Sequence, residues 1–435
     1  MIVEATYDII IIGAGISGLT AANLLAQHNG VTFKVLEASP RIGGRIRSSE
    51  GFSDFPVELG AEEVHGERTA WYELLKSRKV SFVEEQEEDY FWWRYQFLHQ
   101  EAFNKLDDAC RIRDLEEVIP SYAGEEKSVR DFIIWYGIPY RVHHIINAYY
   151  GAEYGTSMNR VSMISLRKNW HKWNAGEENY RLRGTSHQSV LDQHFATVLK
   201  HVQTDTAIES VDTRGNYIRL MDARATPYKC QSVIVTVPLP ILQKKMLNFV
   251  PQLPENYRMA IDGLEMGKGL KAVLKFKHRF WPDKMGSVYG SGLVAEFWAT
   301  GLGRSKKNNL LTAYCMGDAA ERLGAMDEKS RIEKILIELD LIFGEAVASK
   351  EYEEALWVDW TKEPYILGSY TYPSKNDNQY RRILSRPLND RIFFAGEATN
   401  TKGHYGSVHG AVESAIRAVQ DWEEAHLLGK GKSDM

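Results

Sequence analysis

The sequence predicts an α/β fold in which one domain is built on a parallel sheet and a second domain is of the α+β kind. The chain has 435 residues, more than one typical core accommodates, so two domains are expected. Apolar, β-branched runs at 9–12 and 233–235 are typical of strands that are buried on both faces. Polar and apolar residues alternate over 267–276, which indicates an antiparallel sheet elsewhere in the chain.

The first strand leads into a glycine-rich turn that predicts a dinucleotide site. Gly13, Gly15 and Gly18 have G-x-G-x-x-G spacing between the 9–12 strand and a helical pattern at 19–26. The first glycine allows a tight turn, the second lets the backbone approach a pyrophosphate, and the third lets helix and strand pack closely. The helix N-terminus offers free N–H groups and a partial positive charge to the phosphates.

An acidic residue and a second glycine pair extend this site. Glu37 follows the predicted strand 32–36, where a carboxylate accepts both hydroxyls of an adenosine ribose and repels a 2′-phosphate. Next along the chain, Gly44 permits close backbone approach, and Arg45, with Arg41 as an alternative, could neutralise a diphosphate. A plain dehydrogenase does not need this second segment.

The remaining elements follow from local patterns. Segments 128–136, 141–150 and 189–199 are predicted to be helices, and Asp327 is expected to cap a helix that Gly344 ends. Strands are expected at 206–211, 232–237, 267–276, 293–298, 310–314 and 391–396, and a further helix opens at 408.

Composition narrows the class of protein. The net charge of −5 does not favour nucleic-acid binding, and the three cysteines lack the spacing of a zinc site or a disulfide framework. No apolar run approaches the roughly 20 residues of a membrane span, and the first strand begins too early for a signal peptide. We therefore expect a cytoplasmic monomer or homodimer with no metal, nucleic-acid or membrane partner.

Several motifs together resemble the flavin-containing amine oxidase superfamily, which includes polyamine, monoamine and L-amino-acid oxidases. The resemblance covers most of the chain, is weakest from about 80 to 190, and is closest to polyamine-oxidase-like members. It is carried by G-x-G-x-x-G-L at 13–19, G-G-R at 43–45, E-L-G-A at 58–61, F-A-G-E-A-T at 394–399 and V-H-G-A at 408–411. Desaturases and porphyrinogen oxidases share the N-terminal motifs, but the C-terminal ones separate them from this chain.

The resemblance implies FAD as cofactor and a division of the chain. A Rossmann-like FAD-binding domain would be assembled from three segments, 1–80, 186–262 and 385–435. A substrate-binding domain would comprise 263–384 and a mostly helical insertion, 81–185, that covers the substrate. Further residues expected to bind FAD are Ser17, Ala38, Gly60, Ala61, Ile208, Gly396, Glu397 and Val408.

Three positions match the family's catalytic residues. Lys271 matches the flavin-facing lysine, which holds a water near flavin N5 and aids the reaction of reduced flavin with oxygen. Tyr370 matches one ring of the aromatic pair that flanks the amine in monoamine oxidases, and Trp360 matches an aromatic near the flavin. Ser369 stands where monoamine oxidases carry a cysteine bonded to the flavin, so the FAD is expected to be non-covalent.

The substrate side departs from monoamine oxidases. Ser407 replaces the second ring of the aromatic pair, which favours a larger or longer amine, and Tyr405, with His404, is a candidate to fill the gap. His65 falls where polyamine-oxidase-like members carry a residue facing the substrate, and Glu296 is a candidate partner for a distal ammonium.

Glu62 and Glu63 favour a substrate with a second cationic group. Many amino-acid oxidases carry an arginine here for the substrate carboxylate, whereas an acidic mouth suits putrescine, spermidine or spermine. The predicted reaction is hydride transfer from an amine to flavin N5, with O2 reduced to H2O2 and the imine hydrolysed to an aldehyde or ketone. The alternatives are an L-amino-acid oxidase, a flavin amine dehydrogenase with another electron acceptor, and an inactive flavoprotein that binds a partner.

Overall fold

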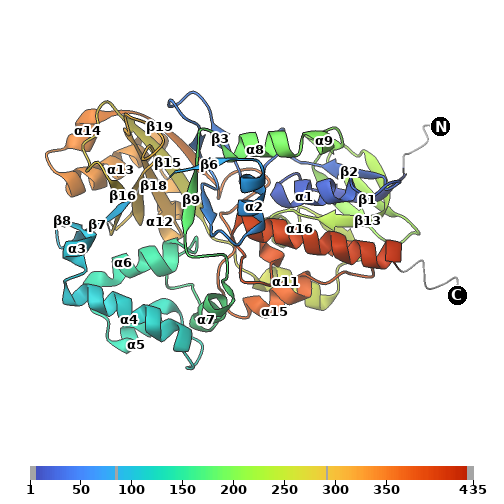
Figure 1. Ribbon diagram of the computed structural model, residues 1–435. Helices are drawn as coiled ribbons and strands as arrows, with labels where there is room; N and C mark the ends of the chain where they lie inside the picture. The colour runs from blue at the N-terminus through green and yellow to red at the C-terminus, as the bar shows by residue number, and fades with distance from the viewer. Residues whose placement is uncertain (1–5, 84–86, 291, 429–435) are drawn as a thin grey trace.

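Two large sheets, each with its own helices, organise the molecule (Figure 1). The computed structural model describes residues 6–83, 87–290 and 292–428. Helices α1 and α16 pack beside the first sheet, and α12 to α14 lie beside the second. The mixed α/β class predicted from the sequence is confirmed.

The first sheet has eight strands drawn from segments far apart in the chain. Its path is β10-β2-β1-β13-β12-β11-β14, and β20 pairs with β13. The contacts of β1 with β2 and β13, of β2 with β10, and of β13 with β20 are parallel, whereas β12 is antiparallel to both neighbours. The strands are β1 Thr6–Ile12, β2 Phe33–Leu36, β10 Val202–Gln203, β11 Ile208–Asp212, β12 Ile218–Asp222, β13 Pro227–Val235, β14 Asn248–Val250 and β20 Ile392–Phe394.

Strand β1 shows why this sheet is buried on both faces. Ile9 and Ile11 belong to a core shared with α1 (Ile16–Leu25), α2 (Ala70–Ser77) and α16 (Val408–Glu423). Ile10 and Ile12 alternate to the other face and pack in a second core. That second core includes residues of α10 Leu239–Gln243, α11 Glu255–Gly263 and α15 Asp377–Leu384.

The second sheet is antiparallel except at one contact. Its order is β19-β15-β18-β17-β16-β7-β8, and only β16 and β7 run parallel among the pairs of this sheet within the described residues. The strands are β7 Glu88–Trp93, β8 Gln96–His99, β15 Gly269–Phe276, β16 Met285–Tyr289, β17 Glu296–Ala299, β18 Leu310–Met316 and β19 Tyr352–Asp359. Packed against it are α12 Asp318–Gly324, α13 Glu328–Phe343 and α14 Val347–Glu351.

The capping residues predicted from the sequence for α13 are confirmed. The side chain of Asp327 accepts a hydrogen bond from the backbone N–H of Ser330, and Gly344 ends the helix with φ at +81°. Asp327 therefore satisfies an N–H group that the first turn of the helix leaves free, and glycine adopts the positive φ at the end without strain.

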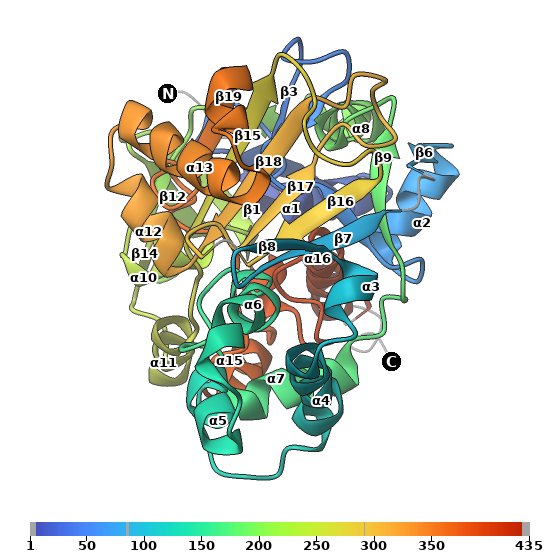
Figure 2. The ribbon, with the colours of Figure 1, turned by 90° about the vertical axis from the view of Figure 1, so that its left-hand side faces the viewer.

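Within residues 88–172, β7 and β8 form one edge of the second sheet, and helices α4 to α7 lie below the sheet in Figure 2. The predicted helices at 128–136 and 141–150 are confirmed as α5 and the η1–α6–η2 run. The aromatic-rich stretch 88–99 instead forms β7 and β8, because its large rings fit a half-buried sheet edge. The helical elements are α3 Gln100–Phe103, α4 Asp107–Ser121, α5 Val129–Tyr136, η1 Tyr140–Val142, α6 His143–Asn147, η2 Ala148–Ala152 and α7 Met163–Lys172.

Short elements complete the part of the chain that the structure describes. They are β3 Ser48–Ser49, β4 Val57–Glu58, β5 Glu63–His65, β6 Ser81–Phe82, β9 Asn179–Arg183, α8 His187–His194, α9 Ala196–Leu199, η3 Glu397–Thr399 and η4 Glu424–Leu428. None of the described helices has the length and apolar character needed to cross a bilayer. The residue bounds predicted for the two domains stay a prediction.

Candidate active site

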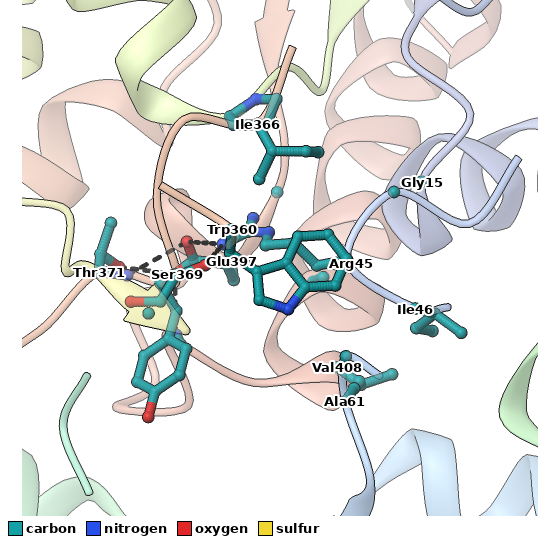
Figure 3. A pocket seen from close by; sticks show the side chains of 18 of the residues that line it. Gly15, Arg45, Ile46, Ala61, Trp360, Ile366, Ser369, Thr371, Glu397 and Val408 are labelled. Carbon is teal, nitrogen blue, oxygen red and sulfur yellow. Dashed lines mark hydrogen bonds and ion pairs between the residues drawn. The ribbon is translucent and has the colours of Figure 1, made fainter. Parts of the chain in front are cut away.

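A cavity of about 1270 Å³ is lined by residues from both sheets and from the helical segment between them (Figure 3). Its walls include the start of α1, the turn at 43–46, and strands β15 and β18. Every residue that the sequence suggested for the site lines this cavity, except Gly18 and His404. The structure thus brings these residues together, whereas their roles stay predictions.

The turn between β1 and α1 has room for a phosphate group. Gly13 has φ at +109°, and a Cβ on Gly18 would stand 1.9 Å from the carbonyl oxygen of Gly13, so Gly18 serves packing rather than the cavity. Gly15 has open space where a Cβ would stand, and the buried hydroxyl of Ser17 has no hydrogen-bond partner among the described residues. A free helix N-terminus beside an orphaned hydroxyl fits the pyrophosphate of a dinucleotide.

Glu37 holds the same turn in place. Its Oε2 accepts a hydrogen bond of 2.6 Å from the backbone N–H of Ala14, and its Oε1 accepts from the N–H and hydroxyl of Ser39. A carboxylate has about four acceptor positions, so capacity for ribose hydroxyls remains. Arg41 donates to the carbonyl oxygen of Gly44 at 2.7 Å, which braces the glycine pair from within.

Arg45 is tied to a buried carboxylate on the opposite wall of the cavity. Its Nη1 lies 2.9 Å from Oε1 of Glu397 and 2.7 Å from the carbonyl oxygen of Ser369, as Figure 3 shows. Glu397 also accepts from the hydroxyl of Thr371 at 2.6 Å and the N–H of Gly406 at 2.8 Å. Burial alone would raise the pKa of Glu397, but Arg45 and Thr371 hold it below its usual value. The pair joins the N-terminal and C-terminal motifs of the sequence.

Backbone segments from four regions complete this part of the wall. Gly60 passes so close to Arg45 that a Cβ would stand 1.9 Å from its carbonyl oxygen. Gly396 ends β20 with φ at +113°, and Val408 begins α16. Ala38, Ala61 and Ile208, the first residue of β11, also line the cavity, as expected for the predicted cofactor residues.

Lys271 reaches the cavity from β15 and is held by a carboxylate. Its Nζ lies 2.6 Å from Oε2 of Glu62, 3.4 Å from the carbonyl oxygen of Gly60 and 5.0 Å from the ring centre of Trp298. Oε1 of Glu62 lies 3.0 Å from Nη1 of Arg304. All three charged side chains are at most 5% exposed, so the two cations flank one buried anion.

The interpretation of Glu62 as part of an acidic mouth is therefore wrong. Burial would raise the pKa of Glu62, but Lys271 and Arg304 lower it to about 2. Its charge is neutralised from both sides and is not offered to a substrate. Glu63, the next residue, begins β5, and nearly half of its side chain is exposed.

Tyr370 is paired with a second tyrosine that the sequence analysis left unassigned. The hydroxyls of Tyr370 and Tyr314 lie 2.5 Å apart, and Tyr370 also donates to the carbonyl oxygen of Glu153 at 2.8 Å. Tyr314 lies directly across the β15–β18 pair from Lys271. Trp360 is buried and donates its indole N–H to the carbonyl oxygen of Leu59 at 3.0 Å. These three rings form an aromatic wall near Lys271.

Ser407 has a structural task that occupies its hydroxyl. It caps α16 by accepting from the N–H of Gly410 at 3.0 Å, and it donates to the carbonyl oxygen of His404 at 2.6 Å. Because residue 407 is a serine that caps α16, it provides no aromatic ring to the cavity. Tyr405 lines the cavity nearby, and its ring lies 3.5 Å from the guanidinium carbon of Arg381.

Three carboxylates line the cavity beyond the tyrosines. Within the described parts of the chain, the carboxyl groups of Glu153 and Glu296 form no ion pair with a cationic side chain, and Oε1 of Glu296 accepts from the hydroxyl of Ser287 at 2.6 Å. Burial, followed by repulsion from Glu153, Glu63 and Asp89, raises the pKa of Glu296 to about 8. Burial and Glu63 likewise raise the pKa of Glu153. This end of the cavity is deficient in positive charge.

His65 and several rings frame these carboxylates. Nδ1 of His65 lies 3.0 Å from Oδ1 of Asn179, and its ring contacts that of Trp173 edge-on. Tyr149 and Tyr289 pack against each other with ring centres 5.1 Å apart, and both line the cavity. Aromatic faces beside carboxylates suit an organic cation.

The sequence analysis missed Glu153, Tyr314 and Arg304. Strand periodicity could have found Tyr314, because it alternates with residues of an apolar strand that was recognised. Glu153 follows η2, where the family resemblance is weakest, and Arg304 lies in the β17–β18 connection. No local pattern distinguishes either of them from a surface charge.

The glycine turn, the paired carboxylate at Glu37 and the cavity between two sheets define a dinucleotide-dependent oxidoreductase. The family model for flavin containing amine oxidoreductases matches residues 16–133 and 141–421. The chain therefore belongs to this family, whose enzymes use FAD. The family resemblance inferred from the motifs is confirmed.

Curated relatives extend over most of the chain. Probable polyamine oxidase 4 of Arabidopsis thaliana is 26% identical over 98% of this chain and 92% of its own length. Flavin-containing amine oxidase A of Equus caballus is 27% identical, with 98% and 86% covered. Lysine-specific histone demethylase 2 of Homo sapiens is 27% identical over 94% of this chain, which spans about half (52%) of that relative.

Solved structures share the fold. A putrescine oxidase double mutant superposes with a TM-score of 0.83 at 19% identity, covering 96% of this chain and 99% of that one. Cyclohexylamine oxidase from Brevibacterium oxydans gives 0.80 at 18% identity, with 96% and 100% covered. At these identities the likeness establishes the fold alone.

Proposed function

We propose that this enzyme oxidises a diamine or polyamine. The observation that carries the proposal is the set of carboxylates Glu63, Glu153 and Glu296, which share one cavity with Lys271 and Tyr370. Glu63 and Glu153 keep access to solvent and Glu296 is partly buried, and the three lie close enough to repel one another. A second ammonium group on the substrate would relieve that repulsion, so the site favours a dication over a monoamine.

The residues present fit FAD. The N-terminus of α1 and Ser17 would hold the pyrophosphate, and Glu37 would hold the ribose. Arg45 and Glu397 would contact the middle part of the cofactor. Bound FAD would supply the redox chemistry, namely acceptance of a hydride from the α-carbon of the amine and transfer of the two electrons to O2, which with two protons gives H2O2; water would hydrolyse the imine.

The protein's own part is to position the amine and exclude water. In this proposal Tyr370 and Tyr314 present their rings to the reacting end of the substrate, and their shared hydrogen bond fixes both side chains. Burial raises the pKa of both phenols, so neither acts as a base near neutral pH. Trp360 closes the wall behind them. Lys271 supplies the positive charge that assists oxygen reduction.

An L-amino-acid oxidase is less well supported by the same cavity. The substrate carboxylate would need a cation, and the buried guanidinium of Arg304 is already paired with Glu62. Arg181 is likewise paired, with Glu87. An amine dehydrogenase and an inactive flavoprotein remain outcomes of the experiment that follows.

The test is anaerobic addition of single amines and amino acids to the holoenzyme while the flavin spectrum is recorded. Rapid bleaching by putrescine or spermidine, followed by recovery in air with H2O2 formed, is the expected result. Bleaching only by an amino acid would refute the proposal. Bleaching by polyamines without recovery in air would identify a dehydrogenase, and no bleaching at all would favour a non-catalytic flavoprotein.

A matched substrate pair isolates the carboxylates. Putrescine and butylamine differ in the second amino group, so Glu153→Gln should raise the KM for putrescine about tenfold and leave that for butylamine within about twofold. An equal change for both amines would mean that Glu153 does not recognise the distal ammonium.

A further inference from the structure

The buried trio Lys271, Glu62 and Arg304 has a net charge of +1. Lys271 and Arg304 contribute one positive charge each, and Glu62, with its pKa lowered to about 2, contributes one negative charge. Isolated buried charges are strongly unfavourable, so removal of the single anion would leave two cations that repel each other. The position and ionisation of the lysine therefore depend on Glu62.

Hydrogen bonds also fix the backbone around Glu62. Its carbonyl oxygen accepts a hydrogen bond of 3.0 Å from Nε2 of His187, a fully buried ring in α8. Two residues earlier, Gly60 offers its carbonyl oxygen to Lys271 at 3.4 Å. The ammonium is thus bounded by Glu62, Gly60 and the ring of Trp298. This enclosure fixes Nζ at the cavity wall instead of leaving a flexible side chain.

We propose that Glu62 is a positioning residue that keeps Lys271 charged and directed at the flavin edge. The inference rests on the proposed function, because it assumes that Lys271 serves the reduction of oxygen. In that step two electrons pass from the reduced cofactor to O2, which takes up two protons and leaves as H2O2. Lys271 stabilises the negative charge on oxygen and is neither oxidised nor consumed.

The surrounding charges do not replace Glu62 as a partner of the lysine. On β9, Arg181 is paired with Glu87 and adds a further positive influence on Glu62. On the neighbouring strands β17 and β18, Glu296 bonds to Ser287 and Tyr314 bonds to Tyr370. Strand β19 places Val358 opposite Lys271. The Glu62 carboxylate is therefore the anion in direct contact with Nζ among the described residues.

The test is Glu62→Gln, which keeps the shape of the side chain but removes its charge. Lys271 and Arg304 would then repel each other, and the lysine is the one that can release a proton, because guanidinium groups keep theirs. After reduction with dithionite, reoxidation of E62Q by O2 should slow between about pH 6 and about pH 10, and the fold-change should exceed that of the wild type by about tenfold or more. Dithionite bypasses the amine, so this result is independent of the substrate.

Sulfite binding to the oxidised holoenzyme provides a readout without turnover. Sulfite forms a reversible anionic adduct with protein-bound flavins, and a neighbouring cation favours it. The Kd for sulfite of E62Q, divided by that of the wild type, should rise about tenfold or more over the same pH range. This rise should disappear when both proteins also carry Lys271→Met.

Controls separate positioning from a loss of folding. Glu354→Gln removes the partner of Lys275, which lies on the same strand outside this cavity, with Nζ 3.0 Å from Oε1 of Glu354. Its pH profiles should match the wild type. If E62Q fails to retain flavin, Glu62→Asp keeps the charge and should reoxidise more slowly with an unchanged pH profile. Profiles of E62Q parallel to the wild type, or a shifted profile in E62D, would overturn the inference.

Discussion

Replacing Glu296 with glutamine should stabilise the protein in a pH-dependent way. The pKa of this carboxyl is about 8 in the fold because burial and neighbouring acids disfavour its charged form, against 4.5 as the ordinary value. In the unfolded chain the group loses its proton first. Stability contributed by Glu296 is therefore present below the ordinary pKa and is lost as the pH rises toward 8.

The size of the effect follows from the two pKa values. Between about pH 5 and about pH 7 the carboxyl group releases its proton in the unfolded chain but keeps it in the folded protein. The free energy of unfolding of the wild type therefore falls by about 2.5 kcal/mol relative to that of E296Q. Unfolding entropy near 2.1 cal/mol/K per residue over 435 residues converts this to a Tm difference of about 3 °C.

The assay is differential scanning calorimetry of both holoenzymes in matched buffers across this pH range. The Tm advantage of E296Q should grow by about 3 °C between the two pH values. Other titrating groups are shared by the two proteins, so most of their contribution cancels. A constant difference in Tm would refute the argument that this carboxyl is held protonated in the cavity.

Three further predictions concern the cofactor. Arg45→Ala leaves Glu397 buried and unpaired at a cost of about 3 to 5 kcal/mol, so the purified variant should contain much less flavin per chain by absorbance than the wild type. Gly18→Ala forces a Cβ toward the carbonyl oxygen of Gly13, which should lower both flavin content and Tm; an unchanged holoenzyme would contradict the packing role. Ser369 cannot form a thioether, so acid precipitation should release the yellow flavin into the supernatant, and colour retained in the pellet would disprove non-covalent binding.

Local patterns were sufficient for five strands of the first sheet and for the dinucleotide turn, whereas β10, β12 and β14 were not predicted. Each depends on neighbours in sequence: Ile9 to Ile12 form a strand because of their β-branched side chains, and Gly18 is close to Gly13 because helix and strand must meet there. The 88–99 stretch was not predicted as two strands, because the turn that joins β7 to β8 is made by Arg94 and Tyr95, which have positive φ with no glycine as a signal, and because β7 joins the sheet through β16, about 200 residues later. Such pairing depends on tertiary contacts.

Glu62 shows the same limit within the site. Its sequence neighbours, Ala61 and Glu63, suggested a loop of surface acids, whereas its carboxylate is neutralised by Lys271 and Arg304 from separate parts of the second sheet. Two adjacent glutamates thus serve opposite purposes. One is an internal counter-ion, whereas the other begins β5 and keeps nearly half of its side chain exposed.

The cavity as a whole separates charge along its length. Where the flavin would lie, the N-termini of α1 and α16, Arg45 and the trio around Lys271 provide positive potential, which suits an anionic cofactor and the charge that develops on oxygen. Beyond Tyr370, Glu153 and Glu296 can take the opposite sign, because a bound ammonium group would favour the charged form of a carboxyl whose pKa is raised. In the proposed reaction a dication would be drawn to the carboxylates and repelled at the flavin end, so the amine that reaches the flavin would be favoured in its neutral form. Since hydride can leave only beside a neutral amine, the separation of charge that would select such a substrate would also prepare it for oxidation.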